Sequence, residues 1–348
     1  MKPIRIGDRL IGPGQPCFII AEAGSNHDGR LEQAKDLIRW AAQAKADAVK
    51  FQVFRARRLY PQSAGTSRYL RIARPIHEVI AELEMPYEWI PELAEECRKH
   101  GIEFLCSVFD REGVDLLDPY VRAFKVASYE LSDIPLVRYV AGKGKPVILS
   151  TGAADLSEVE ETVAEMRATG NDQLALLQCT ASYPAPLATL HLRAMKCLQE
   201  RFDVPVGLSD HSRDPLVGPL TAVGAGAQIL EKHFTLSNDL PGPDHRFAVE
   251  PAELVLMVQK VRDAELALGQ EVKAIDPVEQ ELRDFTRRGV FTVRAVAEGE
   301  HLTEDNIAVM RCGSLPVGLP PKRYPGLLGK VATRDLPAET PIREGDFR

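Results

Sequence analysis

The sequence predicts an α/β protein, a (β/α)8 TIM barrel followed by a small, mostly β domain. Two observations carry this prediction. Eight short apolar runs, each ending in a polar or glycine-bearing cluster, recur through the first three quarters of the chain, and amphipathic helical stretches separate them. Strands that alternate with helices are typical of a parallel sheet, and eight such units favour a closed barrel over an open doubly wound sheet.

The eight runs are rich in Ile, Val, Leu and Phe and lack strict alternation, as expected of strands that are buried on both faces. They are CFIIAEAGSN (17–26), AVKFQVF (48–54), EFLCSVFD (103–110), AFKVASYE (123–130), PVILSTG (146–152), LALLQCT (174–180), PVGLSDH (205–211) and QILEKHFT (228–235). In a barrel, the polar residues at the carboxyl ends of these runs face one common mouth.

The helices are predicted from apolar residues spaced three and four apart, in stretches 31–46, 86–101 and 156–170. The last two stretches end on glycine, a common helix stop. Segment 55–85 is too long for a plain βα loop, so we expect an excursion over the barrel mouth. No G-x-G-x-x-G motif follows a strand, which disfavours a dinucleotide-binding fold.

The pattern changes near residue 270. We predict a barrel domain at 1–270, a charged linker at 271–286 and a compact, mostly β domain at 287–348. In the last segment, short β-like runs alternate with Gly/Pro turns. A module this small is marginally stable alone and is expected to dock on something.

Composition excludes several classes of function. The 348 residues include 43 Lys and Arg against 50 Asp and Glu, a net charge of −7, which gives no support to a nucleic-acid or anionic membrane surface. No segment approaches the apolar length of a membrane span, and the first residues lack a signal-peptide core. The six cysteines are scattered without a C-x-x-C pair. We therefore expect reduced thiols and a cytoplasmic location.

Two lysines inside apolar runs are the first candidates for chemistry. Lys50 lies in AVKFQ and Lys125 in AFKVAS, and lysine is rarely buried unless paired. A salt bridge to a neighbouring strand, an anion clamp and a Schiff-base amine all remain open. Hydroxyls toward the carboxyl ends of the runs favour a phosphate or carboxylate ligand, and they are Ser107, Ser128, Ser150 and Ser209.

Two histidines end neighbouring runs. His211 is the last residue of the seventh run and His233 lies near the end of the eighth. Neutral imidazoles on adjacent strands can share one divalent ion and leave coordination positions open to substrate and water. The alternative is two unrelated polar histidines.

The chain resembles the sialic acid synthase (N-acetylneuraminate synthase) family along nearly its whole length. The matching motifs occur in the family's order: IIAEAGSNHDG (19–29), VKFQ (49–52), KVASYE (125–130), PVILSTG (146–152), LLQCTASYPAP (176–186), GLSDHS (207–212), EKHFT (231–235) and PGPDH (241–245). In addition, RRGVFTVRAVAEGEHLTEDNI (287–307) resembles the start of the family's antifreeze-like SAF domain.

The resemblance implies condensation of phosphoenolpyruvate with an N-acetylated mannosamine-type sugar to a nine-carbon 2-keto acid sugar and phosphate. It implies that His211 and His233 bind a divalent metal, usually Mn²⁺, with Mg²⁺ or Co²⁺ possible. It makes Glu22, Lys50 and Lys125 the catalytic candidates. The implied substrate-binding residues are Gln52, Ser107, Ser128, Glu130, Ser150, Tyr183, Ser209, Asp244 and Arg311.

Arg311 matches an arginine that the SAF domain of one subunit offers to the site of its partner, which implies a domain-swapped homodimer. Three departures from the family pattern, Gln178, Ala181 and Cys312, leave the acceptor sugar open. A pseudaminic or legionaminic acid synthase with a 2,4-diacetamido-6-deoxyhexose acceptor is the alternative. More distant alternatives are a Schiff-base barrel aldolase and a non-catalytic carbohydrate-binding protein.

Overall fold

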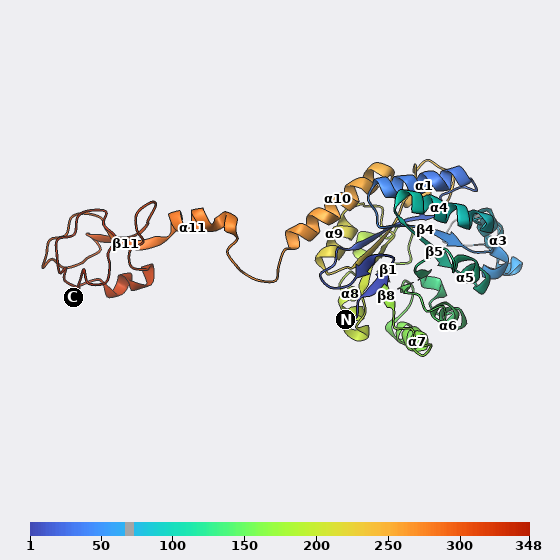
Figure 1. The fold of residues 1–348 in the computed structure, drawn as a ribbon, viewed down its shortest axis with the longest axis horizontal. Coiled ribbons are helices and arrows are strands. Elements are labelled where there is room, and N and C mark those ends of the chain that lie inside the picture. Colours follow the sequence, from blue (N-terminus) through green and yellow to red (C-terminus); the bar gives the residue numbers. More distant parts are fainter. Residues whose placement is uncertain (67–72) are drawn as a thin grey trace. The chain divides into compact units, whose positions relative to one another are not determined.

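A computed structural model describes residues 1–66 and 73–348. It divides the chain into two compact units, Met1–Gly269 and Gln270–Arg348. The first unit holds a closed barrel of parallel strands surrounded by helices (Figure 1). The predicted fold class, a TIM barrel followed by a small domain that contains an antiparallel sheet, is confirmed.

The barrel strands coincide with the eight apolar runs. Their order around the barrel follows the sequence, and β10 closes the circle by pairing with β3. The strands are β3 (Phe18–Gly24), β4 (Ala48–Val53), β5 (Glu103–Val108), β6 (Phe124–Val126), β7 (Val147–Ser150), β8 (Leu174–Cys179), β9 (Val206–Asp210) and β10 (Ile229–His233).

The register of the strands brings the candidate side chains level with one another. Glu22 lies opposite Lys50 across β3 and β4, and His233 lies opposite Glu22 across β10 and β3. Ser107 and Lys125 are likewise paired across β5 and β6. Residues far apart in the sequence therefore meet at the carboxyl end of the barrel.

The surrounding helices bury the apolar faces that their spacing predicts. In α1, for example, Ala34, Leu37, Ile38 and Ala41 are buried. The helices are α1 (Leu31–Gln43), α4 (Ile90–His100), α5 (Arg111–Leu117), α6 (Ile134–Ala141), α7 (Leu156–Arg167), α8 (Ala194–Phe202), α9 (Val217–Gly224) and α10 (Pro251–Leu268).

Local signals explain where two of these helices begin or end. α7 begins with a capping box between Asp155 and Glu158. α4 ends at Gly101, whose φ of 66° lies in the left-handed region that glycine tolerates best. The stretch predicted from residue 86 begins with a 3-10 turn, Tyr87–Trp89, before α4 itself.

An N-terminal hairpin lies outside the predicted elements. It consists of β1 (Ile4–Ile6) and β2 (Arg9–Ile11). Ile4, Ile6 and Ile11 pack with the first residues of the barrel strands, among them Phe18 and Ala48. The hairpin thus covers the amino end of the barrel and leaves the carboxyl end open.

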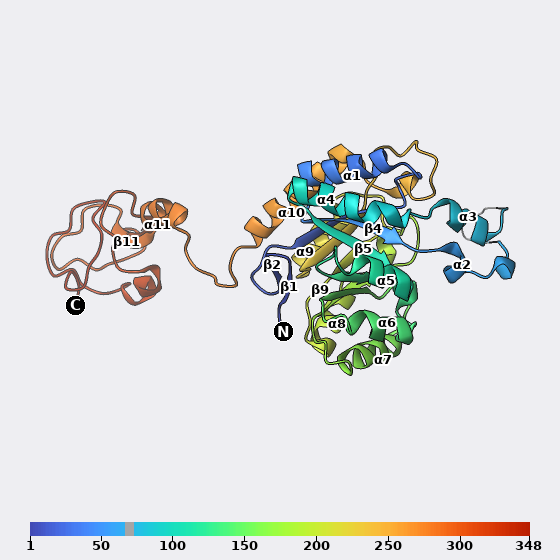
Figure 2. The same ribbon diagram turned by 45° about the vertical axis from the view of Figure 1, so that its right-hand side comes forward.

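The excursion predicted between β4 and α4 contains α2 (Ala56–Leu59), a 3-10 turn (Gln62–Ala64) and α3 (Ile76–Glu82). These elements project beside the barrel (Figure 2). Residues 67–72 of this excursion lie outside the described residues.

The second unit is less regular than its β-like runs suggest. Over its residues, all of them described, it has one two-stranded antiparallel sheet of β11 (Arg288–Thr292) and β12 (Ile307–Arg311). Its other pairings are single bridges such as Val296 with Leu336, and the run YPGLLGK begins in a 3-10 helix, Pro321–Gly326. The segment predicted as a linker contains a 3-10 turn, Pro277–Glu279, and α11 (Gln280–Thr286).

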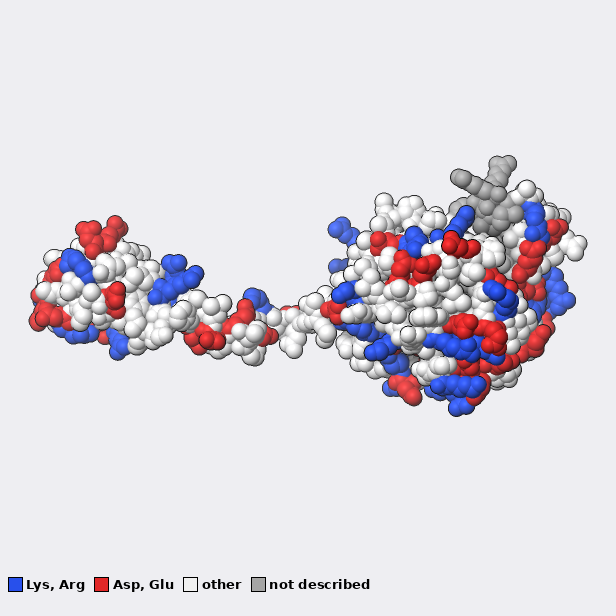
Figure 3. Space-filling model, turned by 90° about the horizontal axis from the view of Figure 1, so that it is seen from above, with Lys and Arg blue, Asp and Glu red and all other residues white. Residues whose placement is uncertain are grey.

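The surface carries both signs of charge. On the face of the barrel unit seen in Figure 3, Lys and Arg side chains alternate with Asp and Glu side chains. Exposed pairs such as Arg138 with Glu165 and Arg201 with Glu160 contribute to this mixture. Among the described residues, no helix combines the length and apolarity needed to cross a bilayer.

Candidate active site

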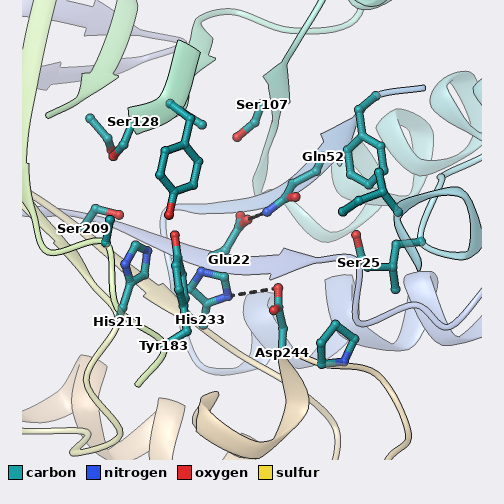
Figure 4. Close-up of a pocket in the computed structure, with 18 of the residues that line it drawn as sticks. Glu22, Ser25, Gln52, Ser107, Ser128, Tyr183, Ser209, His211, His233 and Asp244 are labelled. Atoms are coloured by element: carbon teal, nitrogen blue, oxygen red, sulfur yellow. Dashed lines mark hydrogen bonds and ion pairs between the residues drawn. The ribbon is translucent and has the colours of Figure 1, made fainter. Parts of the chain in front are cut away.

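A pocket of about 570 Å³ opens at the carboxyl ends of the barrel strands. It brings together most of the site residues predicted from the sequence (Figure 4). These are Glu22, Lys50, Gln52, Ser107, Lys125, Ser128, Ser150, Tyr183, Ser209, His211, His233 and Asp244.

Lys50 is held by neighbours on both adjacent strands. Its Nζ lies 2.7 Å from Oε2 of Glu22 on β3 and donates a 2.8 Å hydrogen bond to the Ser107 hydroxyl on β5. Gln52 donates a 2.8 Å hydrogen bond to the other oxygen of Glu22. The salt bridge that the sequence left open is therefore present, within a pocket that also has the donors of an anion clamp.

Lys125 lies farther from any carboxylate than Lys50 does. Its Nζ donates to the Ser150 hydroxyl at 2.7 Å and to the Val126 carbonyl at 3.1 Å. Its nearest carboxylate is Glu231, at 3.9 Å. The structure thus surrounds a buried ammonium mainly with neutral oxygens.

Glu231 joins the two lysines and was not among the predicted site residues. Its second carboxylate oxygen lies 3.8 Å from Lys50, and the Ser209 hydroxyl donates to its first oxygen at 2.9 Å. The signal that could have found it is its place in EKHFT, two residues before His233. Two ammonium groups and two carboxylates therefore share the floor of the pocket.

Burial dominates the electrostatics of this group. Burial raises the pKa of Glu22, and the neighbouring charge of Glu231 raises it further against the pull of Lys50. Burial also lowers the pKa of Lys125. Burial alone would raise the pKa of Glu231 as well, but the charges of Lys125 and Lys50 outweigh burial there and lower this pKa. Of the two carboxyls, Glu22 is therefore the one that takes a proton more readily.

The serine hydroxyls complete an anion-binding surface. Ser128 accepts a 3.0 Å hydrogen bond from the backbone N–H of Gly152, so its hydroxyl is fixed at the end of β6. Ser107, Ser128 and Ser209 border the pocket from three different strand ends (Figure 4). Ammonium and hydroxyl donors arranged in this way bind a small ligand that carries phosphate or carboxylate groups.

His211 and His233 lie side by side, with ring centroids 5.1 Å apart. Nδ1 of His211 is 3.0 Å from the Thr180 carbonyl, which can only accept, so this nitrogen donates, and in the neutral imidazole Nε2 carries the lone pair. Nδ1 of His233 is buried, has no hydrogen-bond partner among the described residues and lies 3.9 Å from Oδ2 of Asp244. Burial lowers the pKa of His233 well below its usual range.

These features fit a divalent ion that has two protein ligands. A lone pair fixed by a carbonyl and a buried, neutral imidazole are the donors such an ion requires. Within residues 1–66 and 73–348, no group of three or more His, Cys, Asp or Glu side chains is arranged to hold a metal. The fit is thus to a site that water and substrate complete.

One wall of the pocket is aromatic. The Tyr183 ring lies 4.3 Å from that of His211 and 5.5 Å from that of Phe247, centroid to centroid. Phe247 in turn lies 5.0 Å from His233. The aromatic wall therefore fixes the orientation of both imidazoles.

Another wall of the pocket is apolar. It comes from the excursion between β4 and α4, whose residues line the pocket. The sequence did not single out its members, which are Tyr60, Ala64, Ile76, Val79, Ile80 and Leu83. The apolar spacing of Ile76, Val79 and Ile80 in α3 is the signal that could have found them. Ser25, Arg246 and Phe247 also line the pocket and were missed as site residues.

Two predicted residues lie elsewhere. Glu130 ends the 3-10 turn Ser128–Glu130 after β6 and is not among the pocket-lining residues. Burial raises its pKa to about 7, and its Oε2 has no hydrogen-bond partner among the described residues. Arg311 ends β12 in the second unit, where its side chain is exposed. A role for either residue stays a prediction.

The fold and the pocket together define a (β/α)8 barrel with the lining of an active site at the carboxyl ends of its strands. The chain belongs to the NeuB family, because residues 37–273 match that family and residues 287–348 match the SAF domain. The family predicted from the sequence motifs is thereby confirmed.

Individual relatives agree with this assignment. The chain is 43% identical over 361 residues to spore coat polysaccharide biosynthesis protein SpsE of Bacillus subtilis, covering 98% of this chain and 96% of that protein. The crystal structure of that protein matches with a TM-score of 0.69 at 41% identity, over 100% of this chain and 99% of that one.

Two further relatives carry names of enzymes. N,N'-diacetyllegionaminic acid synthase of Legionella pneumophila is 37% identical over 340 residues, covering 95% of this chain and 94% of that protein. The structure of an N-acetylneuraminic acid synthetase from Leptospira borgpetersenii, in complex with citrate, matches with a TM-score of 0.74 at 33% identity, over 81% and 95% of the two chains.

Proposed function

We propose that the protein condenses phosphoenolpyruvate with an N-acetylated amino sugar of the N-acetylmannosamine type. The products are a nine-carbon 2-keto acid sugar and phosphate. The observation that carries this proposal is the buried pair Lys50 and Lys125 among serine hydroxyls at the barrel mouth. Phosphoenolpyruvate has a carboxylate and a phosphate, so two ammonium groups and several hydroxyls suit it.

The chain's own residues bind and orient the enol. Lys50 and Lys125 neutralise the two acidic groups. Ser107 accepts a hydrogen bond from Lys50 and Ser150 accepts one from Lys125, so each hydroxyl proton is free to be donated to the ligand. Glu22 lies 2.7 Å from Lys50 and has a raised pKa. A carboxyl of this kind can stabilise a cationic carbon or move one proton.

C3 of phosphoenolpyruvate attacks the aldehyde carbon of the open-chain sugar and forms the new C–C bond, leaving an oxocarbenium-like centre at C2. Water adds at C2, and loss of its proton gives a tetrahedral hemiketal phosphate. This intermediate expels phosphate and becomes the 2-keto acid, while the former aldehyde oxygen takes up a proton and becomes a hydroxyl.

We also propose that His211 and His233 bind a divalent ion, Mn²⁺ in the first instance and Mg²⁺ or Co²⁺ otherwise. The orphaned Nδ1 of His233 and the fixed tautomer of His211 support this assignment. When bound, the ion supplies Lewis acidity toward the carbonyl oxygen of the sugar. The residues around it, Tyr183 and Phe247, hold the two imidazoles in place and keep bulk water from one side.

A second candidate acceptor is a 2,4-diacetamido-6-deoxyhexose, as in a pseudaminic or legionaminic acid synthase. The observation that favours it is the apolar wall of Ile76, Val79, Ile80 and Leu83. A 6-deoxy methyl group and two acetamido methyl groups bury more apolar surface against such a wall than hydroxyls do. The legionaminic acid synthase relative is consistent with this choice.

We propose that the enzyme works as a domain-swapped homodimer in which Arg311 of one subunit reaches the sugar bound to the other. The support is the family resemblance of the MRCG segment and the exposure of Arg311 at the end of β12. We also propose a cytoplasmic location, with no nucleic-acid or membrane partner. All six cysteines are unpaired thiols, as is usual in a reducing compartment.

A phosphate-release assay tests the proposal. Phosphate should appear only when phosphoenolpyruvate and an acceptor sugar are both present, and EDTA should stop its release until Mn²⁺ is restored. A Schiff-base aldolase acting through Lys125 would instead survive chelation and be trapped by borohydride in the presence of substrate. A non-catalytic carbohydrate-binding protein would release no phosphate with any sugar, which would overturn the proposal.

A further inference from the structure

A buried Asp–His pair joins two loops at the mouth of the barrel. His245 lies in the 3-10 turn His245–Phe247 after β10 and its side chain is 0% exposed. Its Nε2 donates a 2.8 Å hydrogen bond to Oδ1 of Asp28, a residue 217 positions away in the loop after β3. Its Nδ1 lies 2.6 Å from the hydroxyl of Thr235. Both ring nitrogens are therefore engaged.

The loop that carries Asp28 is itself held in place. Gln33 donates 2.7 Å hydrogen bonds to the second oxygen of Asp28 and to the Asn26 carbonyl. Asn26 donates in turn to the Phe234 carbonyl at 2.9 Å. Asp28 has a φ of 48°, in the left-handed region that Asp and Asn enter more readily than most residues.

The loop after β10, which carries His245, leaves room for the imidazole at Gly242. A Cβ on Gly242 would lie 2.8 Å from the His245 ring and 3.1 Å from Oδ1 of Asp28, so a side chain at position 242 would push the two apart. The pair therefore locks the loop after β10 against the loop after β3, at the seam where β10 closes the barrel. We call this contact the seam latch, consisting of Asp28, Thr235 and His245.

Residues within two positions of His245 in the chain line the pocket, although His245 itself does not. Asp244 and Phe247 both line the pocket, and Asp244 lies 3.9 Å from His233 while Phe247 packs against the rings of His233 and Tyr183. The latch thus fixes the backbone from which these two side chains project. Lys50 and Lys125 project from the strands β4 and β6 and not from this loop.

We propose that Asp28 and His245 are positioning residues that set the sugar side of the pocket without touching either substrate. This inference rests on the proposed function for its substrate names. Removing one partner leaves the other buried and unpaired. The loop after β10 then becomes less ordered, and the side chains of Asp244 and Phe247 are no longer held in position. Binding of phosphoenolpyruvate, which depends on the two strand lysines, is left nearly unchanged.

The experiment compares kinetic constants of variants at the latch. Asp28→Ala and His245→Ala should each raise the KM for the acceptor sugar about tenfold, with the KM for phosphoenolpyruvate within about twofold of the wild type. Asp28→Asn keeps one acceptor oxygen for the imidazole and a tolerance for left-handed φ but loses the acceptor for Gln33, so it should recover part of the affinity. The double alanine variant should be no worse than either single variant, because one interaction is lost in all three.

A matched control is available at the opposite end of the barrel. Asp47 has a side chain that is 6% exposed and accepts hydrogen bonds from the Ile19 N–H at 2.8 Å and from Arg262 at 2.9 Å. Asp47→Ala removes a comparably buried carboxylate and should leave both KM values unchanged. If Asp47→Ala raises the sugar KM as much as Asp28→Ala does, or if Asp28→Ala raises both KM values equally, the proposal is overturned.

A readout without substrate separates this inference from the proposed function. Amide hydrogen exchange over residues 241–249 should accelerate in Asp28→Ala and His245→Ala, and return toward the wild-type rate in Asp28→Asn. If an alanine variant does not fold, Thr235→Val removes only the hydroxyl and should give a smaller change in the same direction. Unchanged exchange overturns the latch, whether or not the wild type turns over any sugar. A wild type that turns over no sugar overturns the proposed function alone.

Discussion

The Nζ atom of Lys50 on β4 lies 2.7 Å from Oε2 of Glu22 on β3, and the two side chains are 3% and 1% exposed. Together with Lys125 and Glu231, they form a buried group of two cations and two anions. Phosphoenolpyruvate, a trianion, would therefore compete with carboxylates that already form ion pairs with the two lysines. This competition gives opposite predictions for the two partners of the closest pair.

Lys50→Met should raise the KM for phosphoenolpyruvate at least a hundredfold. The variant loses one of two cations and leaves Glu22 to repel the ligand, a cost of several kcal/mol for an uncompensated buried charge. Steady-state kinetics at saturating sugar measures it. An unchanged KM for phosphoenolpyruvate would remove Lys50 from the anion site.

Glu22→Gln should act the other way on binding. Neutralising the carboxylate releases Lys50 from its partner, so phosphoenolpyruvate should bind more tightly while kcat falls by about 10²–10⁴, the range for loss of a general acid or base. Isothermal titration of phosphoenolpyruvate together with kcat tests both effects. A full kcat in this variant would assign the proton and charge role to another residue.

His211→Asn and His233→Asn should each abolish binding of Mn²⁺. The two neighbouring imidazoles are the proposed protein ligands, so loss of either leaves a single protein donor. Bound metal measured by elemental analysis after gel filtration checks this without an activity assay. His301→Asn, a substitution in the second unit, is the control and should retain the metal. Full metal occupancy in both pocket variants would contradict the assignment.

Glu130→Gln should change the pH dependence of stability. Burial raises the pKa of Glu130 to about 7 from an ordinary value near 4.5, so the folded state retains a proton that the unfolded state loses between those values. This contribution is present below pH 4.5 and disappears as pH rises to about 7. The variant should therefore gain in unfolding free energy over the wild type from pH 5 to pH 8, measured by urea unfolding. An equal difference at both pH values would contradict the raised pKa.

Arg311→Ala should raise the KM for the sugar more than the KM for phosphoenolpyruvate. This follows from the proposed contact of Arg311 with the sugar in a partner subunit. Mixing Arg311→Ala with a Lys50→Met chain should restore activity at one site of a mixed dimer. Equal effects on both KM values, or no recovery on mixing, would argue against the swapped arrangement.

The barrel was predictable because each of its elements carries a local signal. Apolar runs mark strands buried on both faces, and Lys50 and Lys125 stand out because charge is rare in such runs. The place of Glu231 between the two lysines depends on the register of β10 against β9 and on the closure of the barrel. No pattern within one segment reports that register.

Other features depend on contacts between distant segments. The hydrogen bond between Asp28 and His245 spans 217 residues and neither motif reveals it. The excursion at 55–85 was predicted from its length alone, and the apolar wall that α3 gives the pocket depends on how this segment folds back over the barrel mouth. In the second unit, β-like runs form mostly single bridges because their pairing is set by tertiary contacts rather than by their own composition.

The mass of the reaction product is the most direct test of the condensation. Phosphoenolpyruvate would be offered with N-acetylmannosamine and with 2,4-diacetamido-6-deoxyhexoses, in the presence of Mn²⁺. We expect a product whose mass equals sugar plus phosphoenolpyruvate plus water minus phosphoric acid, with one phosphate released for each product formed. Phosphate release without any sugar, or no product of this mass with any sugar of the panel, would contradict it.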